Sequence, residues 1–333
     1  STTKINARVF GSGDARPAPY ESLKNFYFRS SYGQLTLQGN VLGWYQPAYT
    51  RASMGTNPTD AQRENLIKEA LEYYDGVGHD FSQYDNNSDG KIDYFAVIWS
   101  GPDNGWANFW WGYQTSWYAT GSPTLDGKTL KDYSWQWEAN SGYTWLYPNF
   151  DPLVLIHETG HALGLPDYYD YNSSIGPKGG VGGLDMMDAN WGDHNCFSKF
   201  LLDWITPTVH TASVTNASLR ASGAYGDAFI VMNTDPGGVF GEYFMVQNRQ
   251  RVENDNDTTY PYPADGLLIW HVDARLDLSG NDFSYDNSYT SHKLLRLMEA
   301  DGLEEIQASA SSWADAGDYY INGKQFGPTT TPN

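Results

Sequence analysis

The sequence predicts an α+β fold in which helices and a central sheet precede residue 206 and short strands follow it. Apolar residues recur at helical spacing over 58–74 and 153–163. Tyr94–Trp99 is an almost continuous apolar run, which suits a strand at the centre of a sheet. After Thr206-Pro207 the pattern changes to short alternating strands, predicted at residues 209–219, 228–233, 243–248, 266–272 and 294–299.

Turn and capping signals predict the other elements. Residues 14–30 are turn-rich and then helical, and a β-hairpin is predicted from 35–37 and 41–44 around Gly39-Asn40. The helix at 58–74 has its cap near Asn57 or Thr59. Its inward residues are predicted to be Leu66, Ala70, Leu71 and Tyr74. A long aromatic insert with short strands is expected at 101–149, and a helix at 197–204. We therefore expect two domains, 1–205 and a β-rich C-terminal region, 206–333, packed on the first.

The helix at 153–163 has signals at both ends. Asp151 is a plausible N-cap, and Pro152 suits the first helical position because its missing N–H costs nothing there. Gly164 stands where a left-handed residue ends helices, and Pro166 prevents continuation. The chain must therefore turn sharply after this helix.

The same helix carries a candidate catalytic zinc site. His157 and His161 lie four residues apart, so both imidazoles project from one face and reach one metal ion. Glu158 sits beside the metal rather than on it, where it can take a proton from a zinc-bound water. The sharp turn brings Asp167, six residues after His161, back to the metal as a third ligand.

This extended motif resembles that of the metzincin clan of zinc peptidases, whose third histidine stands where this chain has Asp167. Metzincins also have a methionine turn beneath the metal, and Met187 in Leu184–Asp188 resembles that methionine. Some related peptidases use an acidic residue just before this turn as a ligand. The third zinc ligand is therefore open between Asp167, which we favour, and Asp185.

The resemblance narrows to the immune inhibitor A family of secreted bacterial metallopeptidases, over roughly residues 25 to 305. The matching segments are Ser31–Gly33, Val41–Tyr45, Asp85–Asp93, Trp99–Gly101, Leu165–Asp170, Asp193–Asn195, Glu242–Phe244, Asn248-Arg249, Leu267–Asp273 and Glu299–Gly302. One departure is the N-terminus, where Ser1–Gly13 offers only a weak version of the family's first apolar strand.

The resemblance implies a metzincin-like zinc peptidase domain at 1–205, with a twisted sheet, an active-site helix and a Met-turn. It implies a secreted zinc endopeptidase that acts on proteins or peptides, with Glu158 as general base. Tyr168 or Tyr169 is a candidate to stabilise the oxyanion. The alternative is an inactive, aromatic-rich module that binds glycans or host proteins, but such a module has no reason to keep Glu158. A glycosidase would need two facing carboxylates and no metal.

A second candidate metal site is the segment Asp85–Asp93, which resembles an EF-hand calcium loop. Oxygen donors recur at alternate positions, Gly90 suits the tight turn, and the carbonyl of Lys91 completes the set. The side-chain donors are Asp85, Asn87, Asp89 and Asp93. The twelfth position is Ala96 rather than the usual bidentate Glu, so the alternative is a turn rich in Asp and Asn that leads into a strand. We expect calcium here.

Charge and composition narrow the partners. The formal net charge of −20 argues against nucleic acids and anionic membranes, which are polyanions themselves. No apolar run of eighteen residues occurs, so no membrane span is expected. Cys196 is the only cysteine, so no disulfide can form within the chain. We expect a monomer.

Overall fold

A computed structural model describes residues 1–14, 16–106, 108–118, 121–139 and 150–330, in two compact units. The first unit comprises residues 1–16, 21–24 and 37–162, and the second comprises 17–20, 25–36 and 163–333. The mixture of helices and small sheets confirms the α+β class. The predicted domains, 1–205 and 206–333, are defined by function and do not correspond to these two compact units. They stay a prediction.

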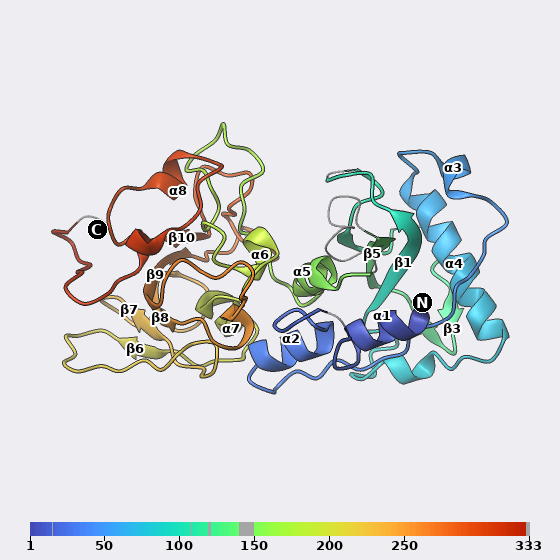
Figure 1. Cartoon of the computed structure of the whole chain (residues 1–333), viewed down its shortest axis with the longest axis horizontal. Coiled ribbons are helices and arrows are strands. Elements are labelled where there is room, and N and C mark those ends of the chain that lie inside the picture. Colours follow the sequence, from blue (N-terminus) through green and yellow to red (C-terminus); the bar gives the residue numbers. More distant parts are fainter. Residues whose placement is uncertain (15, 107, 119–120, 140–149, 331–333) are drawn as a thin grey trace. The chain divides into compact units, whose positions relative to one another are not determined.

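The first unit contains a three-stranded sheet and a two-stranded one (Figure 1). Its helices are α1 (Thr2–Val9), α3 (Arg51–Met54), α4 (Asp60–Gly76), the 3-10 turn η1 (Ser82–Tyr84) and α5 (Leu153–Ala162), and α2 (Leu23–Ser30) starts within it. Its strands are β1 (Phe95–Pro102), β2 (Tyr113–Ser116), β3 (Thr124–Leu125), β4 (Lys128–Thr129) and β5 (Asp132–Ala139).

The central strand of the first sheet is β5, which pairs in parallel with β1 and antiparallel with β2. The prediction that Tyr94–Trp99 forms the sheet centre was therefore wrong: among the described residues, β1 is a strand at the edge of this sheet. Residues 133–137 of β5 are all buried, although two of them are polar. Ser134 bonds the Tyr94 hydroxyl, and Gln136 donates to the Asp151 carbonyl at 3.0 Å. The Ser134 hydroxyl and the Gln136 side-chain nitrogen thus have tertiary partners, which lowers the cost of burying β5 without a continuous apolar sequence.

Helix α4 begins as predicted, and its buried residues lie on the predicted face, where Leu66, Leu71 and Tyr74 also pack against buried side chains. Thr59 and Gln62 form a capping box, which confirms Thr59 as the cap. The buried residues are Arg63, Glu64 and Ile67, whereas the residues predicted to point inward are only half-buried. Arg63 donates to the Tyr133 and Tyr113 hydroxyls at 2.7 and 2.8 Å, so its charge is buried with partners.

The predicted hairpin at 35–44 was wrong, because residues 36–47 form no strand. Instead, side chains from elsewhere in the first unit pack closely against two of its glycines, one in the predicted turn and one in the predicted second strand. A Cβ added to Gly39 would stand 2.5 Å from the Phe10 ring, and one added to Gly43 would stand 3.0 Å from the Tyr74 hydroxyl. The segment is thus held by packing on neighbouring side chains instead of by strand pairing.

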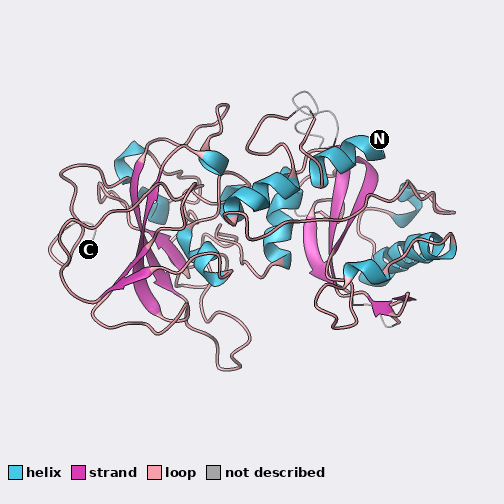
Figure 2. Ribbon diagram, turned by 90° about the horizontal axis from the view of Figure 1, so that it is seen from below, coloured by secondary structure: helices cyan, strands magenta, loops and turns pink. Residues whose placement is uncertain are grey.

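The second unit is built on the sheet β10-β9-β8-β7-β6, whose strong twist is visible in Figure 2. The strands are β6 (Thr208–His210), β7 (Phe229–Val231), β8 (Glu242–Arg249), β9 (Gly266–Asp273) and β10 (Leu295–Leu297). Its short helices are α6 (Met186–Ala189), α7 (Cys196–Leu201), η2 (Glu253–Asp255), α8 (Glu305–Ala308) and η3 (Ala316–Asp318). All five predicted segments contain a strand, although 211–219 does not continue β6.

Tyr243, Trp270 and Leu295 are buried in the main core of the second unit, together with Met187 and Phe197. Within the described part of the chain, no helix is long and apolar enough to cross a bilayer.

Candidate metal centre

Helix α5 starts as its sequence signals indicate. The Leu153 amide donates to Asp151 Oδ1 at 2.9 Å, and the Ile156 amide donates to the Pro152 carbonyl at 2.8 Å. Residues 155–160 are all buried. The helix therefore buries His157 and Glu158, while His161 is half-buried at its end.

The histidines of α5 face each other through their Nε2 atoms. His157 Nε2 and His161 Nε2 lie 3.1 Å apart, and the ring planes are nearly perpendicular, at 84°. Two nitrogens bound to one tetrahedral zinc at ~2.0–2.1 Å would be ~3.3 Å apart, from the usual zinc–nitrogen bond length. The pair thus fits a shared zinc ion with little adjustment.

The chain that follows α5 provides the third ligand candidate. Gly164 has φ +101°, which permits the sharp turn predicted from the sequence. Asp167, His157 and His161 each offer one ligand atom, and these atoms all lie within 4.8 Å of one another. The Tyr168 amide donates to the Met187 carbonyl at 2.9 Å, which fixes the turn at the residue after Asp167. Two nitrogens and one carboxylate oxygen are donors that suit catalytic zinc.

Asp185 has other partners. Its Oδ1 accepts the Met187 amide at 2.7 Å and caps α6, while its Oδ2 accepts the backbone and side-chain amides of Asn195 at 2.6 and 2.7 Å. His194 Nδ1 lies 3.9 Å from Oδ1. In this arrangement Asp185 braces the turn that contains Met187, which is itself fully buried. The choice between Asp167 and Asp185 as zinc ligand stays a prediction, and these contacts favour Asp167.

Glu158 is 6% exposed and follows His157 directly on α5. Its neighbour Tyr94 is buried, and burial raises the pKa of the Tyr94 hydroxyl, with the Glu158 carboxylate adding to the rise. The phenol therefore stays neutral near the carboxylate. The low exposure of Glu158 means that little water surrounds its carboxylate, as suits a general base beside a metal.

The tyrosines after Asp167 differ in their surroundings. Tyr168 is fully buried and its hydroxyl bonds Ser198 Oγ at 2.7 Å, which leaves it poorly placed to reach a substrate. Tyr169 bonds the hydroxyl of Tyr171, which in turn donates to Asp167 Oδ2 at 3.4 Å. Burial and the Asp167 carboxylate raise the pKa of Tyr171 to about 12. The sequence did not single out Tyr171; its spacing of four residues from Asp167 was the available signal.

The Asp85–Asp93 loop is closed by its own hydrogen bonds. Asp85 accepts the amides of Asp89 and Gly90 at 3.0 and 3.1 Å, and Asp93 accepts that of Asn86 at 3.1 Å. Lys128 Nζ donates to Asp85 Oδ2 at 2.6 Å. Among the described residues, two clusters bring together three or more Asp, Glu, His or Cys side chains with their ligand atoms within 4.8 Å of one another. Neither cluster includes a residue of this loop. Calcium binding there stays a prediction, and this geometry is that of the alternative Asp- and Asn-rich turn.

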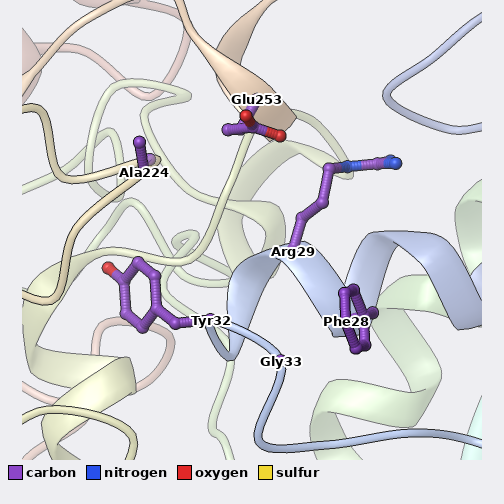
Figure 3. Close-up of a pocket in the computed structure, with 7 residues that line it drawn as sticks. Phe28, Arg29, Tyr32, Gly33, Ala224 and Glu253 are labelled. Atoms are coloured by element: carbon purple, nitrogen blue, oxygen red, sulfur yellow. The ribbon is translucent and has the colours of Figure 1, made fainter.

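A small hollow of about 290 Å³ occurs in the second unit between α2, the turn after it and two loops (Figure 3). Phe28, Arg29 and Tyr32 line one side, and Ala224 and Glu253 face them. The Tyr32 hydroxyl donates to the Ser222 carbonyl at 2.6 Å. Its lining shares no residue with the 153–167 segment.

Comparison with known proteins identifies the relatives of this chain. The family model of the immune inhibitor A peptidase M6 catalytic domain matches residues 9–192, more than half of the chain. An "Immune inhibitor A" of Bacillus thuringiensis subsp. alesti is 27% identical over 186 residues, which cover 45% of this chain and 26% of the relative. The match thus spans about a quarter of that protein's length. Both matches agree with the motifs on α5 and the turn that follows: the chain belongs to the immune inhibitor A family of M6 peptidases.

Proposed function

We propose that this chain is a secreted zinc endopeptidase in which His157, His161 and Asp167 hold the metal and Glu158 is the general base. Membership of a peptidase family makes proteins or peptides the substrate class. The observation that carries the proposal is the convergence of two histidine nitrogens and one carboxylate beside a buried glutamate. Secretion is inferred from the family resemblance.

The residues of the site have distinct tasks in peptide hydrolysis. Zinc, when bound, supplies a Lewis acid for the scissile carbonyl and lowers the pKa of a bound water toward ~7. Glu158 takes the proton of the attacking water and passes it to the leaving amine. Met187 and the capped turn of α6 hold the chain on which Asp167 depends, through the Tyr168 amide. Tyr169 and Tyr171 are candidates to donate to the oxyanion, because Tyr168 is already engaged by Ser198.

Metal analysis combined with casein digestion tests this function. The purified protein should contain about one zinc per chain, digest casein, lose the activity with 1,10-phenanthroline and regain it with added zinc. The alternative function, an inactive module that binds glycans or host proteins, would show zinc without casein digestion. A chain that digests casein equally well in chelator would contradict the metal-dependent mechanism.

A further inference from the structure

Four carboxylates converge in the second unit, away in sequence from the zinc motif. Glu299 follows β10, Asp301 lies in the next turn, Glu305 begins α8, and Asp318 ends η3. Each offers one oxygen, and these oxygens all lie within 4.8 Å of one another. Two oxygens on opposite sides of a calcium ion are ~4.8 Å apart, given calcium–oxygen distances of ~2.4 Å. The spacing of the four oxygens is therefore compatible with one shared ion.

Backbone amides hold three of these carboxylates in place. Glu299 accepts the amides of Glu305 and Ile306 at 2.7 and 3.2 Å, and Asp301 Oδ1 accepts that of Leu303 at 3.0 Å. Asp318 Oδ2 accepts the Asp315 amide at 2.7 Å. The carboxylates are thus ordered by the backbone and do not depend on one another for their orientation.

The carboxylate of Asp301 lies close to the backbone of η3 at Gly317. A Cβ added to Gly317 would stand 2.4 Å from Asp301 Oδ2. Glycine at this position lets the Asp301 carboxylate lie against the turn that carries Asp318. The carboxylates of Asp301 and Asp318 can therefore lie close to each other.

One oxygen of the cluster lacks a partner. Asp318 is 1% exposed, and its Oδ1 has no hydrogen-bond partner within the described part of the chain. A buried carboxylate oxygen without a donor is costly and is rarely left so in native proteins. This orphan oxygen is a second observation, independent of the clustering, that points to a missing positive ligand.

In the described ranges no lysine or arginine forms an ion pair with any of the four carboxylates, although the charge of Lys293 acts on Glu299 from a greater distance. The nearby cations are engaged elsewhere: Lys324 Nζ donates to the Ala300 carbonyl at 3.0 Å, and Arg296 pairs with Glu304. Burial, with Glu299 and Asp301 nearby, raises the pKa of Asp318 to about 7. The four carboxylates therefore lie together without a direct cationic partner in the described ranges.

We propose that Glu299, Asp301, Glu305 and Asp318 bind one calcium ion that ties together the end of β10, α8 and η3. The four side chains offer only carboxylate oxygens. Such ligands suit a hard cation such as calcium or magnesium, whereas zinc sites usually contain nitrogen or sulfur ligands. Calcium accepts six to eight oxygens in irregular geometry, whereas magnesium demands a near-ideal octahedron. Four carboxylates from three separate turns suit calcium better.

Calorimetric titration with calcium chloride tests the site in the full chain, loaded with zinc and freed of calcium by dialysis. Asp318→Asn keeps the shape of the side chain but removes its charge, and Glu305→Gln changes the exposed member of the cluster. Glu304→Gln is the matched control, because Glu304 lies beside the cluster but outside it. Asp89→Ala removes a candidate ligand of the Asp85–Asp93 loop, so that calcium binding at the loop can be distinguished from binding at the cluster.

Asp318→Asn and Glu305→Gln should each bind calcium at this site at least tenfold more weakly, whereas Glu304→Gln and Asp89→Ala should leave it unchanged. Without calcium, Asp318→Asn should melt at a higher temperature than the wild type, because it removes a buried charge that has no direct cationic partner in the described ranges. Adding calcium should raise the wild-type melting temperature and reverse that order. The proposal would be overturned if the wild type had the same calcium stoichiometry and melting temperature as Asp318→Asn and Glu305→Gln. It would also be overturned if the wild type bound no calcium.

Discussion

At the residue scale, the candidate zinc centre depends on which carboxylate completes the histidine pair. Asp167 has an oxygen within 4.8 Å of the ligand nitrogens of His157 and His161, whereas both oxygens of Asp185 accept amide hydrogen bonds. Removing a ligand and removing a brace have different consequences. The first weakens metal binding directly, and the second acts mainly on the stability of the turn.

Asp167→Ala should lower zinc affinity by more than ~100-fold, since even loss of a residue that only orients a ligand typically costs 10–100-fold. Asp185→Ala should retain most zinc affinity but lower the free energy of unfolding by ~2–4 kcal/mol, because it removes the cap of α6 and leaves buried amides without acceptors. Competition with a chromogenic zinc chelator and urea unfolding measure the two effects. Loss of zinc from the Asp185 variant, with retention in the Asp167 variant, would reverse the assignment.

The buried Asp193–Lys199 pair gives the protein a defined acid sensitivity. Lys199 Nζ donates to Asp193 Oδ2 at 2.5 Å, and both side chains are 2% exposed. Burial acts to raise the pKa of Asp193, but Lys199 and Arg249 outweigh it and lower that pKa to about 2. Because the folded pKa lies below the unfolded value of ~3.9, this carboxylate stabilises the fold above pH ~4, and that contribution is lost as the pH falls toward 2.

Between pH 5 and pH 3, the wild type should therefore lose more stability than Asp193→Asn, by on the order of 1–2 kcal/mol. Urea unfolding of both proteins at the two pH values measures the difference, and effects of acid on zinc binding cancel in the comparison. Equal losses in the two proteins would show that Asp193 does not contribute in this way.

At the scale of elements, the sequence predicts those features that residues close in the chain determine, such as the starts of helices. The capping box at Thr59 and the Asp151 and Gly164 signals around α5 act within a few residues, and both helices begin as predicted. The sequence could not reveal that β5 lies between β1 and β2, because Ser134 and Gln136 interrupt its apolar pattern and find their partners only in the tertiary structure. The role of Tyr171 was also missed, because its contact with Asp167 depends on how the turn folds back.

The Asp85–Asp93 loop is the element whose sequence prediction and geometry disagree most. Donor spacing predicts calcium, but Lys128 pairs with Asp85, and Asp89 accepts the Lys91 amide at 2.9 Å. If the loop binds calcium, the ion must displace the Lys128 ammonium and reorient these carboxylates. Lys128→Met would then strengthen binding by removing a competing charge.

Under this prediction, calcium should raise the melting temperature of the Asp318→Asn protein and protect the loop from proteolysis, and adding Asp89→Ala to that protein should abolish both effects without loss of zinc. Melting curves in calcium and in a calcium chelator, recorded on Asp318→Asn to remove the contribution of the other cluster, make the comparison specific. An unchanged curve would leave the loop as a hydrogen-bonded turn.

At the scale of the whole molecule, the acidic charge is distributed over sites with different partners. Of forty acidic residues against twenty basic ones, some are buried with cations, as at Arg249 and Asp255, and others converge without one. Divalent cations are thus expected to stabilise the protein beyond the catalytic requirement for zinc. Chelators should act in two separable ways, by removing activity through zinc and by lowering the melting temperature through calcium.

The central claim is that Glu158 performs the proton transfer beside a metal held by its neighbours, and turnover by zinc-loaded Glu158→Gln tests it most directly. The variant keeps the size of the side chain but cannot accept the proton, so casein hydrolysis should fall by about 10²- to 10⁴-fold while zinc content and melting temperature stay near the wild-type values. Glu72→Gln, an exposed position on α4, is the matched control and should keep full activity. Near-normal hydrolysis by the zinc-loaded Glu158→Gln protein would contradict the account.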